Sequence, residues 1–343
     1  MKNRHKNTMP AEWERHERTI IEWPVIESLN WSEDHKEVME SYSEVINAIV
    51  NFEPVTVIVT EEKMHEARTY CNEKVEFVTI PYNNAWARDT CPTFVWDELG
   101  KIKGICWKFN AWGNKYSPYD LDDKMASDLL DILDVPSIQV PMVLEGGSIH
   151  VDGEGTLLST KECLLNSNRN PKLTQSEIEA VIKEELNIST FIWLNNGLDG
   201  DETDGHIDNI ACFAKPGVIL IQTCHDKGNP NYSITKECLD ILSKAKDAQG
   251  RKVSIIEIPN PPIRYYQGKS LTLSYLNFYL VNDGLILPIF GGDAKESDKQ
   301  AEEVLHSVYP DRQIVKINGM GLIKEGGNVH CITQQMPSPR IAD

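Results

Sequence analysis

LEGGSIHV at residues 144–151 and KEGGNVHC at residues 324–331 are two copies of one phrase, Glu-Gly-Gly-polar-aliphatic-His. Repeated phrases are typical of chains that are built from repeated structural units. The last four predicted helices begin about 50 to 60 residues apart, and a β-rich run follows each of them. We therefore predict an α/β fold of repeated units that close into a ring, because one unit alone cannot bury its apolar face.

Hydrophobic periodicity predicts the elements of these units. Apolar residues recur at helical spacing in five segments, which are residues 33–50, 122–133, 174–186, 233–248 and 296–308. The third helix begins with a capping box of Thr174 and Glu177. Runs rich in β-branched residues predict strands at residues 54–60, 75–80, 217–223, 253–258 and 285–290. A doubly wound α/β sheet is the rival architecture, but no GxGxxG or GxxxxGK(S/T) loop supports it.

Composition and charge limit the classes of partner. The 343 residues carry a formal net charge of -18 at pH 7, which repels nucleic acid and anionic membranes and suits a small cationic substrate. The N-terminal segment lacks an apolar signal core, and no run approaches the roughly 20 apolar residues that cross a bilayer. The eight cysteines include no CxxC pair, which indicates reduced thiols. We expect a cytoplasmic protein.

Four polar clusters combine turn-forming residues with ionisable groups: residues 83–92, 144–150, 197–209 and 325–335. Cys331 is the candidate nucleophile, and it needs a base or a cation that favours the thiolate. If residues 329–333 form a strand, the neighbouring His330 points to the opposite face and cannot serve. The predicted partner is therefore His206, which lies close to Asp208 in a glycine-rich loop.

A thiolate, an imidazole and several carboxylates together suit a guanidinium substrate. Carboxylates bind this planar cation through paired, charge-assisted hydrogen bonds. In this interpretation Cys331 attacks the guanidinium carbon. His206 protonates the departing ammonia and then activates the water that hydrolyses the covalent intermediate. Asp89 and Asp208 hold the guanidinium nitrogens, and Glu145 orients His206.

Seven motifs, in order along the chain, carry a family resemblance: MPAEWERHERTIIEWP (9–24), WARDTCPTFV (86–95), FNAWG (109–113), LEGGSIHVDGEGTLLST (144–160), NRNP (168–171), GDETDGHIDN (200–209) and EGGNVHCITQQMP (325–337). With them the chain resembles the agmatine deiminase family of the guanidine-modifying superfamily. The resemblance implies a five-bladed α/β propeller with one central active site and no metal or organic cofactor. It also implies hydrolysis of agmatine to N-carbamoylputrescine and ammonia through a covalent amidino-thioether, a step of polyamine metabolism.

The roles that the resemblance implies fall on the residues already chosen. The nucleophile is Cys331, the general acid and base is His206, the guanidinium-binding carboxylates are Asp89 and Asp208, and the glutamate of the repeated phrase is Glu145. We expect a single catalytic domain at residues 9–337, between an N-terminal extension at 1–8 and a C-terminal tail at 338–343. The number of chains in the assembly stays open, with a homo-oligomer as one outcome.

The chain departs from the family at two positions, because Cys91 and Glu325 stand where the family usually has glycine. Neither departure removes a catalytic group. Cys91 lies two residues from Asp89 in the sequence. A reversible disulfide between Cys91 and Cys331 is therefore a hypothesis for oxidative inactivation.

The two ends of agmatine make different demands on the site. The far end is a second cation without a carboxylate, so it calls for acidic or aromatic side chains, whereas free arginine would need a basic group. The acidic run at residues 199–204 supplies carboxylates. We predict that Glu202 and Asp204 contact the far amine and that Trp86 stacks on the cation. A peptidyl-arginine or another guanidine is the alternative substrate.

Other classes of protein use overlapping residues. An iron enzyme would combine His206 and Asp208 with a further histidine such as His225, and it would leave Cys331 idle. Calcium binding by DGDETDG at residues 199–205 is not supported, because that loop lacks glycine at its sixth position. A catalytically inactive binding module would keep its function without Cys331.

Overall fold

The computed structural model describes residues 7–25 and 34–340 of the chain. Residues 1–6 of the predicted extension, residues 341–343 of the predicted tail and Glu33, the predicted start of the first helix, lie outside the described residues. Thr8 pairs with Trp96, and the backbone N–H of Ser338 donates to the carbonyl oxygen of Arg15 at 2.8 Å. The described ends of the chain therefore pack against its body.

Five sheets of three or four strands share one strand order. In each sheet the first two strands are antiparallel, and the third strand runs parallel to the second. Four of these sheets follow one another along the chain: β4 Thr93–Trp96, β5 Ile102–Lys108 and β6 Ser137–Val143; β7 Ile149–Val151, β8 Thr156–Thr160 and β9 Thr190–Leu194; β10 Ala211–Lys215, β11 Val218–Thr223 and β12 Ser254–Pro259; β15 Tyr279–Val281, β16 Gly284–Ile289 and β17 Gln313–Asn318.

The remaining sheet joins the two ends of the chain. Its strands are β18 Thr333–Pro337, β1 His16–Glu22, β2 Val55–Val59 and β3 Glu76–Thr79. β18 is antiparallel to β1, with Thr19 opposite Gln335, and β2 is parallel to β1. The C-terminal strand thus completes the unit that begins at the N-terminus. A separate hairpin consists of β13 Arg264–Tyr266 and β14 Lys269–Leu271.

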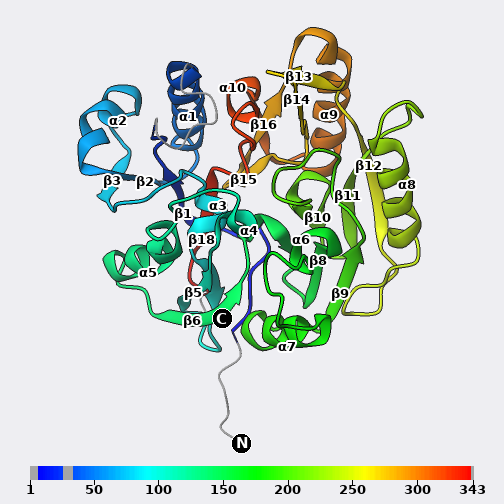
Figure 1. Ribbon diagram of the computed structural model, residues 1–343, viewed down its shortest axis with the longest axis horizontal. Coiled ribbons are helices and arrows are strands. Elements are labelled where there is room, and N and C mark those ends of the chain that lie inside the picture. Colours follow the sequence, from blue (N-terminus) through cyan, green and yellow to red (C-terminus); the bar gives the residue numbers. More distant parts are fainter. Residues whose placement is uncertain (1–6, 26–33, 341–343) are drawn as a thin grey trace, which may run out of the picture.

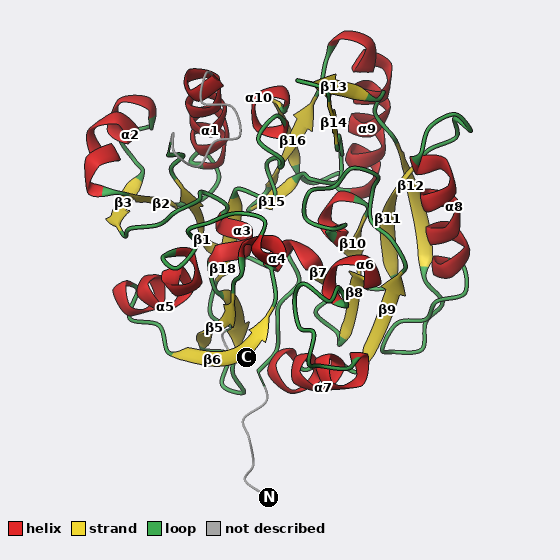
Figure 2. Cartoon of the chain, viewed as in Figure 1, coloured by secondary structure: helices red, strands yellow, loops and turns green. Residues whose placement is uncertain are grey.

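A helical crossover joins the second and third strands of each sheet, as a parallel connection requires. The crossover helices are α1 His35–Ile49, α5 Asp122–Ile132, α7 Gln175–Leu186, α8 Asn231–Leu242 and α9 Lys295–Val308. Shorter helices lie in the connections: α2 Met64–Tyr70, α3 Ala87–Thr90, α4 Ala111–Asn114, α6 Lys161–Leu164 and α10 Met320–Ile323. The crossover helices lie around the outside in chain order, with α3 and α4 near the middle (Figures 1 and 2).

Most of the predicted elements are confirmed. Each predicted helix and strand forms, and Thr174 and Glu177 make the predicted capping box. The helix predicted at 233–248 occupies only Asn231–Leu242. The strand considered for residues 329–333 is wrong, because β18 begins at Thr333. A turn precedes it, in which the Thr333 hydroxyl donates to the carbonyl oxygen of Val329 at 2.9 Å.

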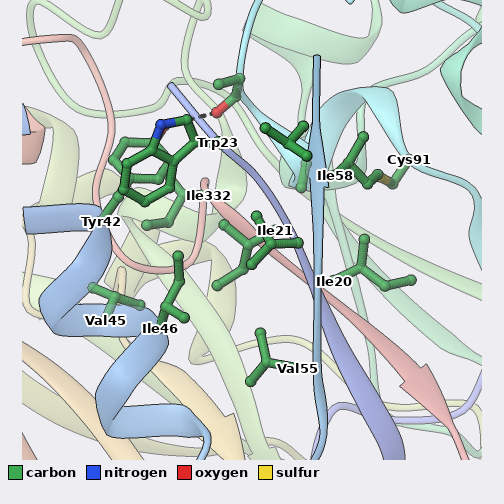
Figure 3. Packing of buried hydrophobic residues seen from close by; sticks show 14 of the residues in the cluster. Ile20, Ile21, Trp23, Tyr42, Val45, Ile46, Val55, Ile58, Cys91 and Ile332 are labelled. Atoms are coloured by element: carbon green, nitrogen blue, oxygen red, sulfur yellow. Dashed lines mark hydrogen bonds between the residues drawn. The ribbon is translucent and has the colours of Figure 1, made fainter. Parts of the chain in front are cut away.

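The largest apolar cluster lies between α1 and the sheet that joins the chain ends. Figure 3 shows Tyr42, Val45 and Ile46 of α1 packed toward Ile21 of β1, and all of them belong to this cluster. Each of these side chains is at most 3% exposed. Burial of one such side chain contributes about 1.5–3 kcal/mol, so this stripe fixes α1 on the sheet.

Neighbouring units also share apolar surface. Leu158 of β8 and Phe213 of β10 belong to one buried cluster, although they come from different sheets. Each unit therefore depends on the next for part of its core. Among the described residues, no helix has both the length and the apolarity that a bilayer span requires.

Candidate active site

Each of the five sheets contributes residues from the segment just before its first strand. Asp89 precedes β4, Glu145 to Gly147 precede β7, His206 and Asp208 precede β10, Asn277 precedes β15, and Cys331 precedes β18. Two of these segments are single 3-10 turns, Gly146–Ser148 and Ile207–Asn209. The shared position in every unit brings these residues together, although they are far apart in the sequence.

Cys331 lies among polar side chains and is only 7% exposed. Its Sγ accepts from Asn277 Nδ2 at 3.2 Å and lies 3.7 Å from Asp208 Oδ2. The Arg88 backbone N–H donates to the Cys331 carbonyl oxygen at 3.1 Å, which ties the turn to α3. Burial, together with the charges of Asp208 and Asp89, raises the pKa of the Cys331 thiol well above its usual value. Cys331, the predicted nucleophile, therefore favours the thiol form at neutral pH.

Two donors fix the carboxylate of Asp89. The Gly147 backbone N–H donates to Oδ1 at 2.9 Å, and Trp112 Nε1–H donates to Oδ2 at 2.9 Å. Burial raises the pKa of Asp89, and the charge of Glu145 adds to this, although His206 and the two donors act in the opposite direction. Trp112 belongs to the FNAWG motif, but its role was not predicted.

Asp208 has an unexpected partner. His330 Nδ1 lies 3.0 Å from Asp208 Oδ2, because the turn before β18 directs the imidazole there and a strand would not. Burial by itself would raise the pKa of Asp208. The hydrogen bond and charge of His330, together with the charges of His206 and Arg88, outweigh burial, and the pKa of Asp208 is lowered. Sequence reasoning set His330 aside as a partner of Cys331 and missed its contact with Asp208.

His206 is 1% exposed, and its Nδ1 lies 3.9 Å from Asp89 Oδ2. No hydrogen bond joins His206 to Glu145 among the described residues, so the predicted orienting contact is not direct. Glu145 Oε1 instead accepts from Arg169 Nε at 2.6 Å. Glu145, Cys163 and His206 do place metal-type donor atoms within 4.8 Å of one another. The guanidinium of Arg169 beside this group disfavours a cation there.

A pocket with a cavity volume of about 30 Å³ opens onto Cys331. Its walls carry three aromatic side chains, which are Trp86, Trp112 and Tyr116, and three carboxylates, which are Asp89, Glu202 and Glu325. None of the described residues that line it is lysine or arginine. The predicted residues Trp86 and Glu202 thus lie on the wall. Such a pocket favours a cation with an apolar stem.

Asp204, like His206 and Asp208, is not among the residues that line this pocket, so its predicted contact with the far amine stays a prediction. The Asp204 carboxylate lies 2.5 Å from Arg169 Nη1 and 2.6 Å from Lys115 Nζ. These two cations account for the position of the Asp204 carboxylate. Glu202 does line the pocket, and its Oε2 accepts a hydrogen bond from the Tyr116 hydroxyl at 3.0 Å.

The structure does not assemble the iron site that was considered. His225 lines a separate groove, where its Nε2 lies 3.8 Å from Glu257 Oε2. Cys91, whose disulfide with Cys331 was considered, directs its thiol to Glu22 Oε1 at 3.9 Å. Neither side chain lines the pocket at Cys331.

Residues 8–337 match the family model of the Porphyromonas-type peptidyl-arginine deiminases. The chain belongs to this family. A relative named agmatine deiminase, from Pseudomonas aeruginosa strain LESB58, is 42% identical over 97% of this chain and 96% of the relative. The solved agmatine deiminase of Enterococcus faecalis matches with a TM-score of 0.91 and 34% identity, over 98% of this chain and 97% of that one. A solved C. jejuni agmatine deiminase, a cysteine-to-serine variant with substrate bound, matches with a TM-score of 0.91 and 29% identity, over 99% of this chain and 98% of that one.

In this member of the peptidyl-arginine deiminase family, Cys331, His206, Asp89 and Asp208 gather as predicted. Sequence reasoning missed Asn277, whose side chain contacts the nucleophile. A signal for it was present, because Asn277 precedes the first strand of its unit just as Asp208 precedes β10. The shared position of these residues, just before the first strand of each unit, can be recognised only when all units are aligned on their first strands.

Proposed function

We propose that this chain is an agmatine deiminase, which hydrolyses agmatine to N-carbamoylputrescine and ammonia in polyamine metabolism. The observation that carries the proposal is the pocket at Cys331, which combines a buried thiol with aromatic and acidic walls. Relatives named agmatine deiminase, matched over nearly their full length, support the same activity. The reaction is the hydrolysis of a carbon–nitrogen bond, and the proposal requires no metal or organic cofactor.

The first half of the reaction forms the covalent intermediate. Asp89 and Asp208 bind the guanidinium nitrogens, and Trp86 stacks on the cation. Cys331 loses its proton to His206, and Sγ bonds to the guanidinium carbon. His206 returns the proton to the departing nitrogen, the carbon–nitrogen bond breaks, and ammonia leaves. An amidino-thioether on Cys331 remains.

The second half releases the product. His206 takes a proton from water, and the resulting hydroxide bonds to the amidino carbon. The carbon–sulfur bond then breaks, and the sulfur regains a proton from His206. The hydroxyl proton of the product passes to solvent, where ammonia takes up a proton, and the neutral ureido product departs. Because Asp208 and Asp89 raise the pKa of Cys331, a guanidinium between them offsets their charge and favours the thiolate. Substrate binding and activation of the nucleophile are coupled in this way.

The far end of the pocket favours agmatine over arginine. The carboxylates of Glu202 and Glu325 attract a distal amine and repel the carboxylate of free arginine. Peptidyl-arginine carries neither the amine nor the free carboxylate, and it remains the alternative substrate within the family. The effect of Glu145 on His206 is indirect, because Glu145 Oε1 accepts its hydrogen bond from Arg169 Nε and not from His206.

A product assay tests the proposal. Purified protein is incubated with agmatine, free arginine or an arginyl peptide, and both ammonia and the ureido product are measured. We expect kcat/KM for agmatine to exceed the other values at least about 100-fold, which corresponds to ~2.7 kcal/mol of transition-state discrimination. Preferred turnover of the peptide would overturn the proposal in favour of a peptidyl-arginine deiminase.

We also propose that the five units form a closed five-bladed propeller, with residues 9–337 as one catalytic domain. The shared strand order, the β18–β1 pairing and the chain-order arrangement of the crossover helices support it (Figure 1). A cytoplasmic location and a homo-oligomeric assembly belong to the same proposal. Cell fractionation tests the location, and light scattering after size-exclusion chromatography tests the assembly.

A further inference from the structure

Three buried ionisable side chains contact one another in sequence, and the last of them lies next to Cys331. Glu12 Oε1 lies 2.8 Å from His330 Nε2, and His330 Nδ1 lies 3.0 Å from Asp208 Oδ2. The same oxygen of Asp208 lies 3.7 Å from Cys331 Sγ. Glu12, His330 and Asp208 are 7%, 3% and 2% exposed, so water screens these contacts little. The proposed chemistry uses neither Glu12 nor His330.

The geometry determines the charge of His330. Both ring nitrogens face a carboxylate oxygen, and a carboxylate can only accept, so both nitrogens must carry a proton. Burial and the charge of Arg88 disfavour an imidazolium, but Glu12 and Asp208 outweigh them and raise the pKa of His330. His330 therefore presents a fixed positive charge to Asp208.

Glu12 is fixed from several sides. His150, the histidine of the first Glu-Gly-Gly phrase, places Nε2 3.5 Å from Glu12 Oε2, and Arg88 Nη1 lies 3.4 Å from Oε1. The histidines of both copies of the phrase thus converge on one carboxylate. Burial would raise the pKa of Glu12, but His330, His150 and Arg88 together lower it. This anchor keeps the imidazole of His330 in one orientation.

We propose that Glu12 and His330 are positioning residues, which hold Asp208 ionised and aimed at the guanidinium and at Cys331. This inference rests on the proposed deiminase function. An unpaired carboxylate at 2% exposure would be driven toward its neutral form, which cannot bind a cation. The imidazolium opposes that tendency at Oδ2, the same oxygen that lies near the thiol. The charged groups that act on Asp208 are His330, His206 and Arg88, and the thiol of Cys331 contacts it.

Two variants test the proposal through the pH dependence of the reaction. Glu12→Gln keeps the shape of the side chain but removes the charge that favours the imidazolium, and His330→Gln removes the imidazolium itself. Without that charge the pKa of Asp208 rises, so the acidic limb of kcat/KM for agmatine should move upward by about one pH unit. At the acidic end of the profile, kcat/KM of each variant should be about tenfold lower than that of the wild-type protein, and raising the pH should recover most of the loss.

A second readout does not depend on turnover of agmatine. The rate of alkylation of Cys331 by a small cationic haloacetamidine, divided by the rate with neutral iodoacetamide, should follow the ionisation of Asp208. The ionised carboxylate attracts only the cationic reagent, whereas its effect on the pKa of the thiol is common to both reagents. The preference for the cationic reagent should shift to higher pH in both variants. If the wild-type protein does not turn over agmatine but shows this preference and its shift, the proposed function fails and the positioning role stands.

A matched control separates positioning from stability. Glu53 Oε1 lies 3.0 Å from His16 Nδ1 in a second buried pair, and neither residue lines the pocket. His16 Nε2 donates to the carbonyl oxygen of Glu12, a contact that Glu53→Gln leaves in place. Glu53→Gln should lower the melting temperature without moving either pH profile. Unshifted profiles in Glu12→Gln and His330→Gln, with losses that merely parallel those of the control, would overturn the proposal.

Discussion

The space around Gly147 gives a direct test of the site geometry. A Cβ at this position would lie 2.5 Å from His206 Nδ1, 3.0 Å from Asp208 Oδ2 and 3.2 Å from Asp89 Oδ1. All three side chains are at most 8% exposed, so none of them can swing into solvent. Gly147→Ala should therefore displace three proposed catalytic groups with a single methyl group.

The expected magnitude follows from these distances. His206 must retreat by roughly 1 Å to reach ordinary van der Waals contact. A misplacement of that size costs on the order of 100-fold in rate, or ~2.7 kcal/mol of transition-state stabilisation. Overpacking costs ~1–3 kcal/mol of stability. Because the φ angle of Gly147 lies outside the left-handed region, alanine adds no backbone strain and the fold should persist.

Steady-state turnover of agmatine and thermal unfolding are the assays. We expect kcat to fall about 100-fold while the melting transition remains cooperative. Gly228→Ala is the matched control, because its Cβ would meet only the Asp226 side chain, whose nearest atom, Oδ1, lies at 3.4 Å, and its φ angle is also ordinary. If kcat of Gly147→Ala equals that of the wild-type protein, His206 does not approach the backbone at residue 147 as closely as the structure indicates.

Three further predictions concern the proposed nucleophile, a carboxylate that we propose binds the guanidinium, and a buried acid outside the pocket. Cys331→Ser should abolish turnover with an unchanged melting temperature. Peptide mapping of the wild-type protein after incubation with agmatine should place the adduct on Cys331, and an adduct on another cysteine contradicts the assignment. Trp112→Phe removes the donor to Asp89, so kcat/KM should fall about tenfold, and an unchanged value would mean that this hydrogen bond is dispensable. Burial raises the pKa of Asp122 to about 7, so its neutral form stabilises the fold at low pH and this contribution is lost as the pH rises from about 4 through 7. Between pH 5 and pH 8 the free energy of unfolding of Asp122→Asn, measured by chemical denaturation, should therefore rise by about 2–3 kcal/mol relative to that of the wild-type protein. A difference between the two proteins that does not change with pH would contradict the buried ionisation.

The sequence predicts this molecule best where local patterns are strong. The crossover helices carry regular apolar stripes, and their positions follow from the sequence within a few residues, apart from the end of α8 at Leu242. The short strands that follow the site segments, such as β7 and β10, have no such pattern because both of their faces are buried. Their existence depends on the neighbouring units.

The chemistry was predictable by residue type, and the partners were not. Cys331, His206, Asp89 and Asp208 could be chosen because a guanidinium reaction needs a thiolate, a proton carrier and carboxylates. The hydrogen bonds of His330 and Asp204 depend on turns and on distant cations, which a sequence pattern does not encode. His330 was misjudged because a turn was taken for a strand. The ion pairs of Asp204 were missed because Lys115 and Arg169 lie far from it in the sequence.

The repeated phrase shows which features the two copies share and where they diverge. In both, the second glycine leaves room for the site: a Cβ at Gly147 would press on His206, and one at Gly327 would lie 2.4 Å from the Trp86 ring and 2.9 Å from Cys331 Cβ. The histidines of both copies contact Glu12.

The glutamates differ, since Glu145 pairs with Arg169 behind the site and Glu325 lines the pocket. The residue after the histidine differs most, because Val151 is a buried strand residue where the other copy has Cys331. Close approach of the backbone and anchoring of the histidine are therefore the shared physical requirements of the phrase. Both copies of the phrase meet these requirements, but only the copy at residues 324–331 ends in the cysteine that we propose as the nucleophile.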